Sequence, residues 1–261
     1  MSLPAPSVIG QVRLDLRGTP SFLAGSVVAA LTYDKPYAYD DADVFVPSPQ
    51  ALISNVQLLR DKGYALNDRF ERVWHRWIRY GFNNWHTNSI KLVSPQGFEL
   101  NLVYKLVEKA PTKNLSSVLE SFDFGLLASG FDLERDTFHD MRSYMFPSHP
   151  VQGPLPLMPN KRDNWRAGFI SQYNGLREAG RYAKYHTYGY DMSLVRDDLL
   201  EGYFNAVSYL SQRDNPDKQL LAQIYEAIAL AIEDENIAEL VEFGKKIPQL
   251  DSLDQIMEAL E

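Results

Sequence analysis

Two aspartates set two positions apart, Asp41 and Asp43, have the residue types and spacing that metal-dependent chemistry needs. The run from Asp43 to Val46 is rich in β-branched and aromatic residues and predicts a strand. Residues two apart on a strand project from the same face, so the two carboxylates would lie side by side. Such a pair repels itself unless a cation neutralises it, and Mg²⁺ prefers hard oxygen ligands and substrate phosphates. The spacing therefore predicts a Mg²⁺ (or Mn²⁺) site on this pair.

Gly25 and Ser26, upstream of this pair, could seat a phosphate. Glycine permits a tight turn where backbone must approach a phosphate, and Ser26 offers a hydroxyl and an N–H at the start of a short helix predicted over 27–31. Helix N-termini favour anions. A third acidic group from a neighbouring strand would complete a two-metal site for in-line attack on a phosphoryl group.

Local signals predict the elements that would position these residues. Ser48-Pro49 is typical of a helix start, and Lys62-Gly63 ends the apolar stripe that follows. The turn residues 94–97 separate apolar runs over 89–93 and 98–106, which predicts a β-hairpin. The alternation over 12–16 predicts a short strand. An acidic run with His139 has poor ligand spacing and is interpreted as a solvated loop; its members are Asp132, Glu134, Asp136 and Asp140.

The order of these motifs resembles the Gly-Ser…Asp-x-Asp signature of the polymerase-β-like nucleotidyltransferase superfamily. Three later stretches, 86–90, 98–103 and 121–124, resemble small, often phage-encoded proteins of this fold. The resemblance extends over roughly residues 20–146. It implies an NTP substrate, a divalent cation on Asp41 and Asp43, and a third carboxylate on the strand matching 98–103. Glu99 and Asn101 both compete for that third position, and because they share one face, periodicity does not choose between them.

The candidate site residues follow from the motifs and the resemblance together. Asp41, Asp43 and Glu99 are the predicted catalytic and metal-binding residues. The segment 177–190 mixes basic and aromatic residues, a mixture that can stack bases and hold phosphates. The predicted nucleotide-binding residues are Gly25, Ser26, Thr87, Asn88 and Lys184.

The composition limits the class of protein. The chain of 261 residues has no cysteine, and its N-terminus lacks the basic and apolar regions of a signal peptide. With no apolar run long enough to span a bilayer, a cytoplasmic protein is expected (host cytoplasm if the chain is phage-encoded). From Arg196 onward there are 15 acidic and 5 basic residues, a net charge of −10, whereas the whole chain has a net charge of −8. This distribution argues against a continuous nucleic-acid-binding face and leaves the acidic C-terminal helices as a surface for a protein partner.

The pattern changes near Pro159 from mixed strands and helices to helices. Helices are predicted over 163–184, 194–213, 217–233, 237–245 and 252–260, the last three with apolar stripes of period 3.6. The expected fold class is α+β: a nucleotidyltransferase-like mixed sheet flanked by helices, followed by an all-α region. The expected domains are a nucleotidyltransferase-like core over 1–150 and a helical domain over 151–261.

Two function hypotheses follow. The first is a Mg²⁺-dependent enzyme that moves an NMP group from an NTP to an acceptor hydroxyl on an RNA end, a protein or a small molecule. The second is a nucleotidyltransferase fold with degraded catalysis, kept as a binding or structural module such as a phage accessory or virion-associated protein. The second is favoured by the acidic tail and, if Asn101 rather than Glu99 holds the third position, by the loss of a carboxylate there.

Overall fold

The computed structural model describes residues 3–66, 71, 74, 88–104, 106–107, 110–111, 113–122, 124–141, 169–250 and 252–261. The chain separates into two compact units, residues 1–150 and 151–261.

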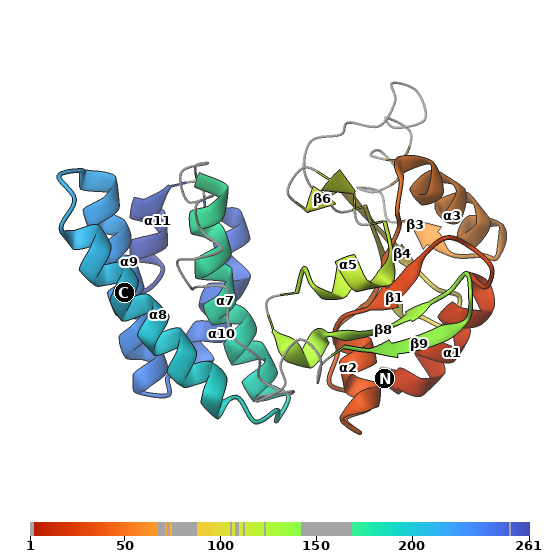
Figure 1. Ribbon diagram of the computed structural model, residues 1–261, viewed down its shortest axis with the longest axis horizontal. Coiled ribbons are helices and arrows are strands. Elements are labelled where there is room, and N and C mark those ends of the chain that lie inside the picture. Colours follow the sequence, from red (N-terminus) through yellow and green to blue (C-terminus); the bar gives the residue numbers. More distant parts are fainter. Residues whose placement is uncertain are drawn as a thin grey trace. The chain divides into compact units, whose positions relative to one another are not determined.

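Unit 1 is built on a mixed sheet (Figure 1). Among the described residues it has seven strands in the order β3-β4-β5-β2-β1-β8-β9. Strands β2 and β5 run parallel, and the other neighbouring pairs are antiparallel. The strands are β1 Phe22–Ala24, β2 Ala42–Phe45, β3 Ala65–Leu66, β4 Asn88–Val93, β5 Glu99–Tyr104, β8 Ser129–Asp132 and β9 Thr137–Asp140; β6 Leu106–Val107 and β7 Ala110–Pro111 form a separate pair.

Helices cover both faces of this sheet. On one face, Phe22, Phe45 and Val103 form an apolar cluster with α5 (Leu115–Leu119), and Phe122 lies edge-on to Phe45. On the other face, Leu23, Val44, Leu100 and Leu102 are fully buried. Helices α2 (Ser26–Thr32) and α3 (Pro49–Asp61) contact the central strands, and α1 (Ala5–Asp15) packs on α2. Burial on both faces fixes the register of the strands, since a slip of one residue would reverse every side chain.

The predicted helix start and hairpin are confirmed. The Ser48 side chain accepts a hydrogen bond from the Ala51 N–H, and Pro49 is the first residue of α3. Strands β4 and β5 pair antiparallel, and the Ser94 hydroxyl oxygen accepts the N–H of Phe98 across the turn. These signals act over a few residues, so they determine local structure with little help from the rest of the fold.

The strand predicted over 12–16 is wrong, because this segment ends helix α1. The alternation of apolar and charged residues there is also compatible with a helix whose buried positions include Val8, Ile9 and Val12. Leu14, which a strand would place beside Val12, is 67% exposed. The spacing over the whole segment, rather than its last five residues, identifies the element.

A buried polar cluster fastens the end of α1 to the residues after α3. The Asp15 carboxylate accepts hydrogen bonds from the Tyr64 hydroxyl at 2.8 Å and from the Gln11 side chain at 2.7 Å. Lys62 Nζ lies 3.3 Å from Asp15 Oδ1. Burial of Tyr64 raises the pKa of its hydroxyl well above the ordinary value of 10.0, and the hydrogen bond to Asp15 and its negative charge raise it further.

Replacing Tyr64 with phenylalanine is expected to cost about 1.5 kcal/mol of unfolding free energy near pH 8, because a hydrogen bond to a charged group is lost. The raised pKa gives stability that is complete below the ordinary value of 10.0 and is lost as pH rises above it, since only the unfolded tyrosine then ionises. The difference in unfolding free energy between the wild type and the variant should therefore become smaller above about pH 10. Urea unfolding of both proteins at several pH values measures it. A gap that stays constant through pH 11 would contradict the raised pKa.

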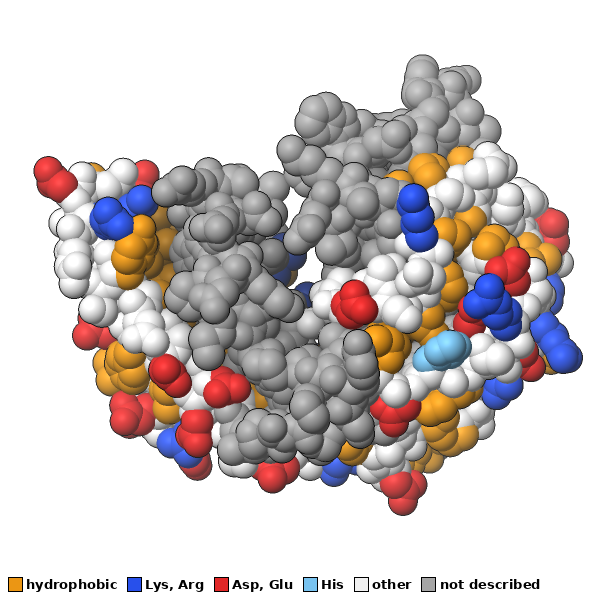
Figure 2. All heavy atoms as spheres, viewed as in Figure 1, with side chains coloured by type: hydrophobic (Ala, Val, Ile, Leu, Met, Phe, Trp, Pro, Cys, Tyr) orange, Lys and Arg blue, Asp and Glu red, His pale blue; other side chains and the backbone are white. Residues whose placement is uncertain are grey.

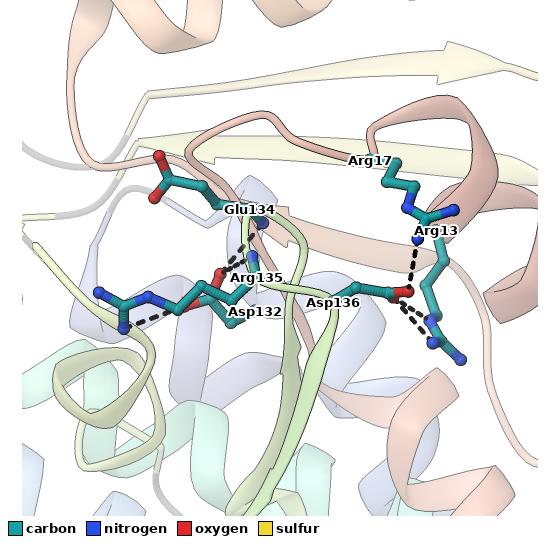
Figure 3. A network of polar contacts seen from close by, with 6 residues as sticks. All are labelled: Arg13, Arg17, Asp132, Glu134, Arg135 and Asp136. Carbon is teal, nitrogen blue, oxygen red and sulfur yellow. Dashed lines mark hydrogen bonds and ion pairs between the residues drawn. The ribbon is translucent and has the colours of Figure 1, made fainter.

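The acidic run around Asp132 forms the β8–β9 hairpin rather than a solvated loop. Asp132 is 6% exposed, and its carboxylate accepts the backbone N–H groups of Glu134 and Arg135 (Figure 3). Asp136 accepts two hydrogen bonds from the Arg13 guanidinium of α1, at 2.8 and 2.9 Å, and Arg17 lies 3.8 Å away. These two carboxylates hold the turn and tie it to α1, which accounts for Asp132 and Asp136, two of the four acidic residues in the run.

Unit 2 is helical in its described part, as the apolar periodicity predicts. Its largest fully buried side chains, among the described residues, are Tyr182, Tyr203, Tyr225 and Phe243. In the segment 177–190, Tyr182, Tyr185 and Tyr190 are buried, so these rings pack inside the unit. The helices are α7 Phe169–Thr187, α8 Ser193–Ser211, α9 Pro216–Glu233, α10 Ile237–Lys246 and α11 Leu253–Glu258.

Acidic side chains are scattered over the visible face of unit 2 rather than gathered in one patch (Figure 2). No helix in the described ranges has the length and apolar character needed to cross a membrane. The predicted fold class, a mixed sheet with flanking helices followed by an all-α region, is confirmed.

Candidate active site

Asp41 and Asp43 lie at the start of β2 in the middle of the sheet. The intervening Ala42 is fully buried, as is Val44, so the strand places Asp43 on the opposite face from these two residues. Both aspartates are partly buried, and the Asp41 side chain is 16% exposed. The carboxylate pair therefore occupies the face that also carries Phe45, at its polar end.

Gly25 brings backbone directly against the Asp43 carboxylate. Ala24 of β1 is the register partner of Asp43, and Gly25 follows it as the residue that caps α2. A Cβ atom added at Gly25 would lie 2.9 Å from Asp43 Oδ2, closer than real Cβ contacts allow. The backbone of Gly25 has φ 86° and ψ −155°, a combination essentially restricted to glycine. Glycine is therefore needed at this position both for the turn and for the space beside Asp43.

The register between β2 and β5 places Asn101 beside Asp43. The two residues are Cα partners in the parallel pair, and Asn101 Nδ2 donates a hydrogen bond of 2.9 Å to Asp43 Oδ1. Asn101 Oδ1 is buried and accepts no hydrogen bond within the described part of the chain. Ala42 pairs with Leu100, so Glu99 lies one row further out, beside Asp41. Its side chain is 53% exposed.

Lys91 joins the two outer carboxylates and was not among the predicted site residues. Its Nζ lies 2.8 Å from Asp41 Oδ2 and 3.1 Å from Glu99 Oε2. Partial burial alone would lower the pKa of Lys91, but hydrogen bonds and charge attraction from Asp41 and Glu99 outweigh it and raise the pKa. The signal was present in the sequence: Ile90 and Leu92 are apolar, so the alternation of β4 turns Lys91 to the other face.

The remaining predicted nucleotide-binding residues are not brought together with the carboxylates by any described contact. Ser26 is 4% exposed as the first residue of α2, so its hydroxyl is largely covered. Thr87 lies outside the described residues. Asn88 begins β4 in register with Tyr104. Lys184 lies on α7 in unit 2, where its Nζ stands over the rings of Tyr185 and Tyr188. Their roles in nucleotide binding stay predictions.

The oxygen atoms of Asp41, Asp43 and Asn101 fit one divalent cation better than two. Within the described ranges, no group of three or more His, Cys, Asp or Glu side chains is arranged to hold a metal ion. Asp41 and Asp43 supply carboxylate oxygens of the hard type that Mg²⁺ prefers. The buried Oδ1 of Asn101 is a neutral oxygen next to them without a hydrogen-bond donor among the described residues. Two carboxylates and an amide oxygen are an acceptable Mg²⁺ ligand set when waters or phosphate oxygens complete it.

The chain is similar to several solved structures. No protein-family model matches it. No curated protein matches it at a significant level. A CCA-adding enzyme in complex with CTP has a TM-score of 0.47 and 11% sequence identity, over 94% of this chain and 57% of that one.

Two further solved structures are similar. The Thermotoga maritima CCA-adding enzyme complexed with tRNA has a TM-score of 0.45 and 11% identity, over 98% of this chain and 62% of that one. The apo form of a CCA-adding enzyme has a TM-score of 0.47 and 14% identity, over 92% of this chain and 53% of that one. The chain thus spans 53% to 62% of the length of these proteins.

Proposed function

We propose that this chain is a Mg²⁺-dependent nucleotidyltransferase that moves an NMP group from an NTP to an acceptor hydroxyl and releases pyrophosphate. The observation that carries the proposal is the pair Asp41 and Asp43 on one sheet face, with the backbone of Gly25 against the Asp43 carboxylate. A carboxylate pair beside backbone that lacks a side chain offers both a cation site and room for a phosphate.

In this proposal each residue of the candidate site has a separate role. Asp41 and Asp43 hold the cation, whose charge offsets that of the triphosphate. Asn101 fixes the orientation of Asp43 through its hydrogen bond of 2.9 Å and presents its free amide oxygen to the cation. Gly25 allows the triphosphate to approach the backbone closely, and Ser26, the first residue of α2, contacts it through its backbone N–H. Positioning and charge neutralisation supply most of the rate in phosphoryl transfer.

The remaining roles extend the same proposal. Glu99 is the third metal ligand or the base that assists the acceptor hydroxyl. Thr87 and Asn88 position the base or sugar, and Lys184 contacts a phosphate. The acceptor is an RNA end, a protein or a small molecule, and the acidic C-terminal helices offer a surface to a protein partner.

A second candidate is a binding or structural module that keeps the fold without efficient transfer, as an accessory protein of a phage would. The observation that favours it is Asn101 as the register partner of Asp43, at the place where a third carboxylate would complete a two-metal site. With an amide there, the site carries less negative charge and attracts a second cation less strongly.

The test is transfer of label from each of the four α-³²P NTPs, with Mg²⁺ or Mn²⁺, to total RNA or to cell lysate. The wild type is expected to transfer label, and the double variant Asp41→Asn/Asp43→Asn is expected to transfer none, because the cation loses both carboxylates. Asp61→Asn, an exposed aspartate at the end of α3, is the matched control and should keep full transfer.

The outcome separates the two candidates. Transfer that the double variant abolishes and Asp61→Asn retains would establish the enzyme, and the labelled product would identify the acceptor class. Folded wild-type protein that transfers no label from any NTP would instead favour the binding module. Transfer that persists in the double variant would remove Asp41 and Asp43 from the proposed mechanism.

A further inference from the structure

A polar row crosses the centre of the sheet next to its apolar cluster. Lys91 on β4 is the register partner of Asn101 on β5, which is the register partner of Asp43 on β2. Register partners on adjacent strands project from the same face, so the three side chains form one row. Phe45 and Val103 form the next row inward, beneath α5. The row thus lies where the apolar cover of this face ends.

The Lys91 ammonium lies between two carboxylates that would otherwise face each other. Asp41 and Glu99 lie side by side at the starts of the parallel pair, since Ala42 is the partner of Leu100. Like charges at such positions destabilise a sheet. The Lys91 Nζ bridges them at 2.8 and 3.1 Å, and its side chain is 39% exposed. It occupies the position between the carboxylates that a bridging cation would take.

The charges of the row explain why one lysine matters. Asp41, Asp43 and Glu99 carry three negative charges, and Lys91 carries one positive charge. The net charge of these four groups is therefore equal to that of two carboxylates, and one divalent cation neutralises it. Two-metal sites for phosphoryl transfer need carboxylates that bridge both cations. Here Asp41 is already bridged to Glu99 by an ammonium, and Asn101 replaces the carboxylate next to Asp43.

We propose that Lys91 is a resident cation of the candidate active site, a positioning residue that holds Asp41 and Glu99 together and takes the place of a second divalent cation. The inference rests on the proposed function in that it assigns a single exchangeable cation to that site. Lys91 orients Asp41 for the exchangeable cation that Asp41 and Asp43 hold. Its pairing with Glu99 leaves to Glu99 the second of its two proposed roles, the base that assists the acceptor hydroxyl.

The test counts Mn²⁺ ions bound per folded chain, by electron paramagnetic resonance and by isothermal titration, without nucleotide. Lys91→Met and Lys91→Gln are each expected to bind one Mn²⁺ more than the wild type, because the freed Asp41 and Glu99 carboxylates accept a cation. Lys91→Gln removes the charge but keeps a hydrogen-bond donor. Lys91→Arg keeps the charge and should bind as many as the wild type.

Two controls isolate the pair of carboxylates. Adding Glu99→Gln to Lys91→Met should remove the extra Mn²⁺, since one of its two carboxylates is lost. Lys245→Met removes an exposed lysine that lies 2.5 Å from the single carboxylate of Glu242, and it should gain no Mn²⁺. If neither Lys91→Met nor Lys91→Gln binds more Mn²⁺ than the wild type, the inference is overturned.

The same measurement judges the proposed function separately. One Mn²⁺ bound per wild-type chain agrees with a cation on Asp41 and Asp43. No bound Mn²⁺ would contradict the metal-binding part of the proposed function. In either case the difference between the wild type and the Lys91 variants decides the role of Lys91. A wild-type count of two would overturn the inference, because the second position would then be open to metal.

Discussion

Replacing Gly25 with alanine is expected to lower nucleotidyl transfer by about 100-fold while the protein stays folded. The added Cβ would lie 2.9 Å from Asp43 Oδ2, so the carboxylate must turn or the start of α2 must move away from β2. Either movement displaces a proposed metal ligand, and a displacement near 1 Å is enough for a loss of that size. The backbone of Gly25, at φ 86° and ψ −155°, adds a strain of about 1–3 kcal/mol.

Comparison with Gly18→Ala separates the effect of the contact with Asp43 from the effect of backbone strain at a positive φ. Gly18 also has a positive φ, 77°, but a Cβ there would meet no heavy atom within 4 Å in the described part of the chain. It should lose stability and keep transfer activity. The two variants are compared in the label-transfer assay, in Mn²⁺ affinity and in urea unfolding. Wild-type transfer and Mn²⁺ affinity in Gly25→Ala would show that the Asp43 carboxylate is not at the reacting centre.

The site was predicted from sequence as far as local patterns reach. Asp41 and Asp43 were placed on one strand face, and Gly25 at the turn before a helix, from neighbours within a few residues. The hairpin signal also placed Glu99 and Asn101 together on β5. Strand periodicity gives the same face to both residues, so it cannot say which of them meets Asp43.

That choice depends on the pairing of two strands far apart in the chain. The parallel register of β2 and β5, with Asp43 opposite Asn101, is fixed by burial of Val44, Leu100 and Leu102 on the opposite face. No single segment contains this information. The position of Lys91 has the same origin, because it reaches Asp41 only through the order β4-β5-β2.

Residues 12–16 show a different limit of prediction from sequence. The five residues 12–16 alternate as a strand would. Residues 12–15 are nevertheless helical, because Ala5, Val8 and Ile9 complete a buried stripe with Val12. A window of five residues fits periods of 2 and 3.6 almost equally well, whereas the full eleven residues of α1 distinguish them.

Replacing Gly180 with alanine is expected to destabilise unit 2 by about 2 kcal/mol. Gly180 on α7 faces Gly244 on α10, and a Cβ added at Gly180 would lie 2.5 Å from the Gly244 Cα. Because the obstacle is backbone rather than a flexible side chain, one helix must shift. Since backbone cannot move aside, the cost of overpacking is expected near the upper end of its usual range, at about 3 kcal/mol, and it is offset by about 1 kcal/mol of helix propensity gained.

Gly10→Ala is the matched control, since Gly10 is also inside a helix. A Cβ there would meet no heavy atom within 4 Å among the described residues, so this variant should gain about 0.5–1 kcal/mol from helix propensity alone. Thermal unfolding followed by circular dichroism measures both changes, and hydrogen exchange should place the loss in Gly180→Ala on α7 and α10. If Gly180→Ala were as stabilising as Gly10→Ala, the two helices would not approach each other through Gly180 and Gly244.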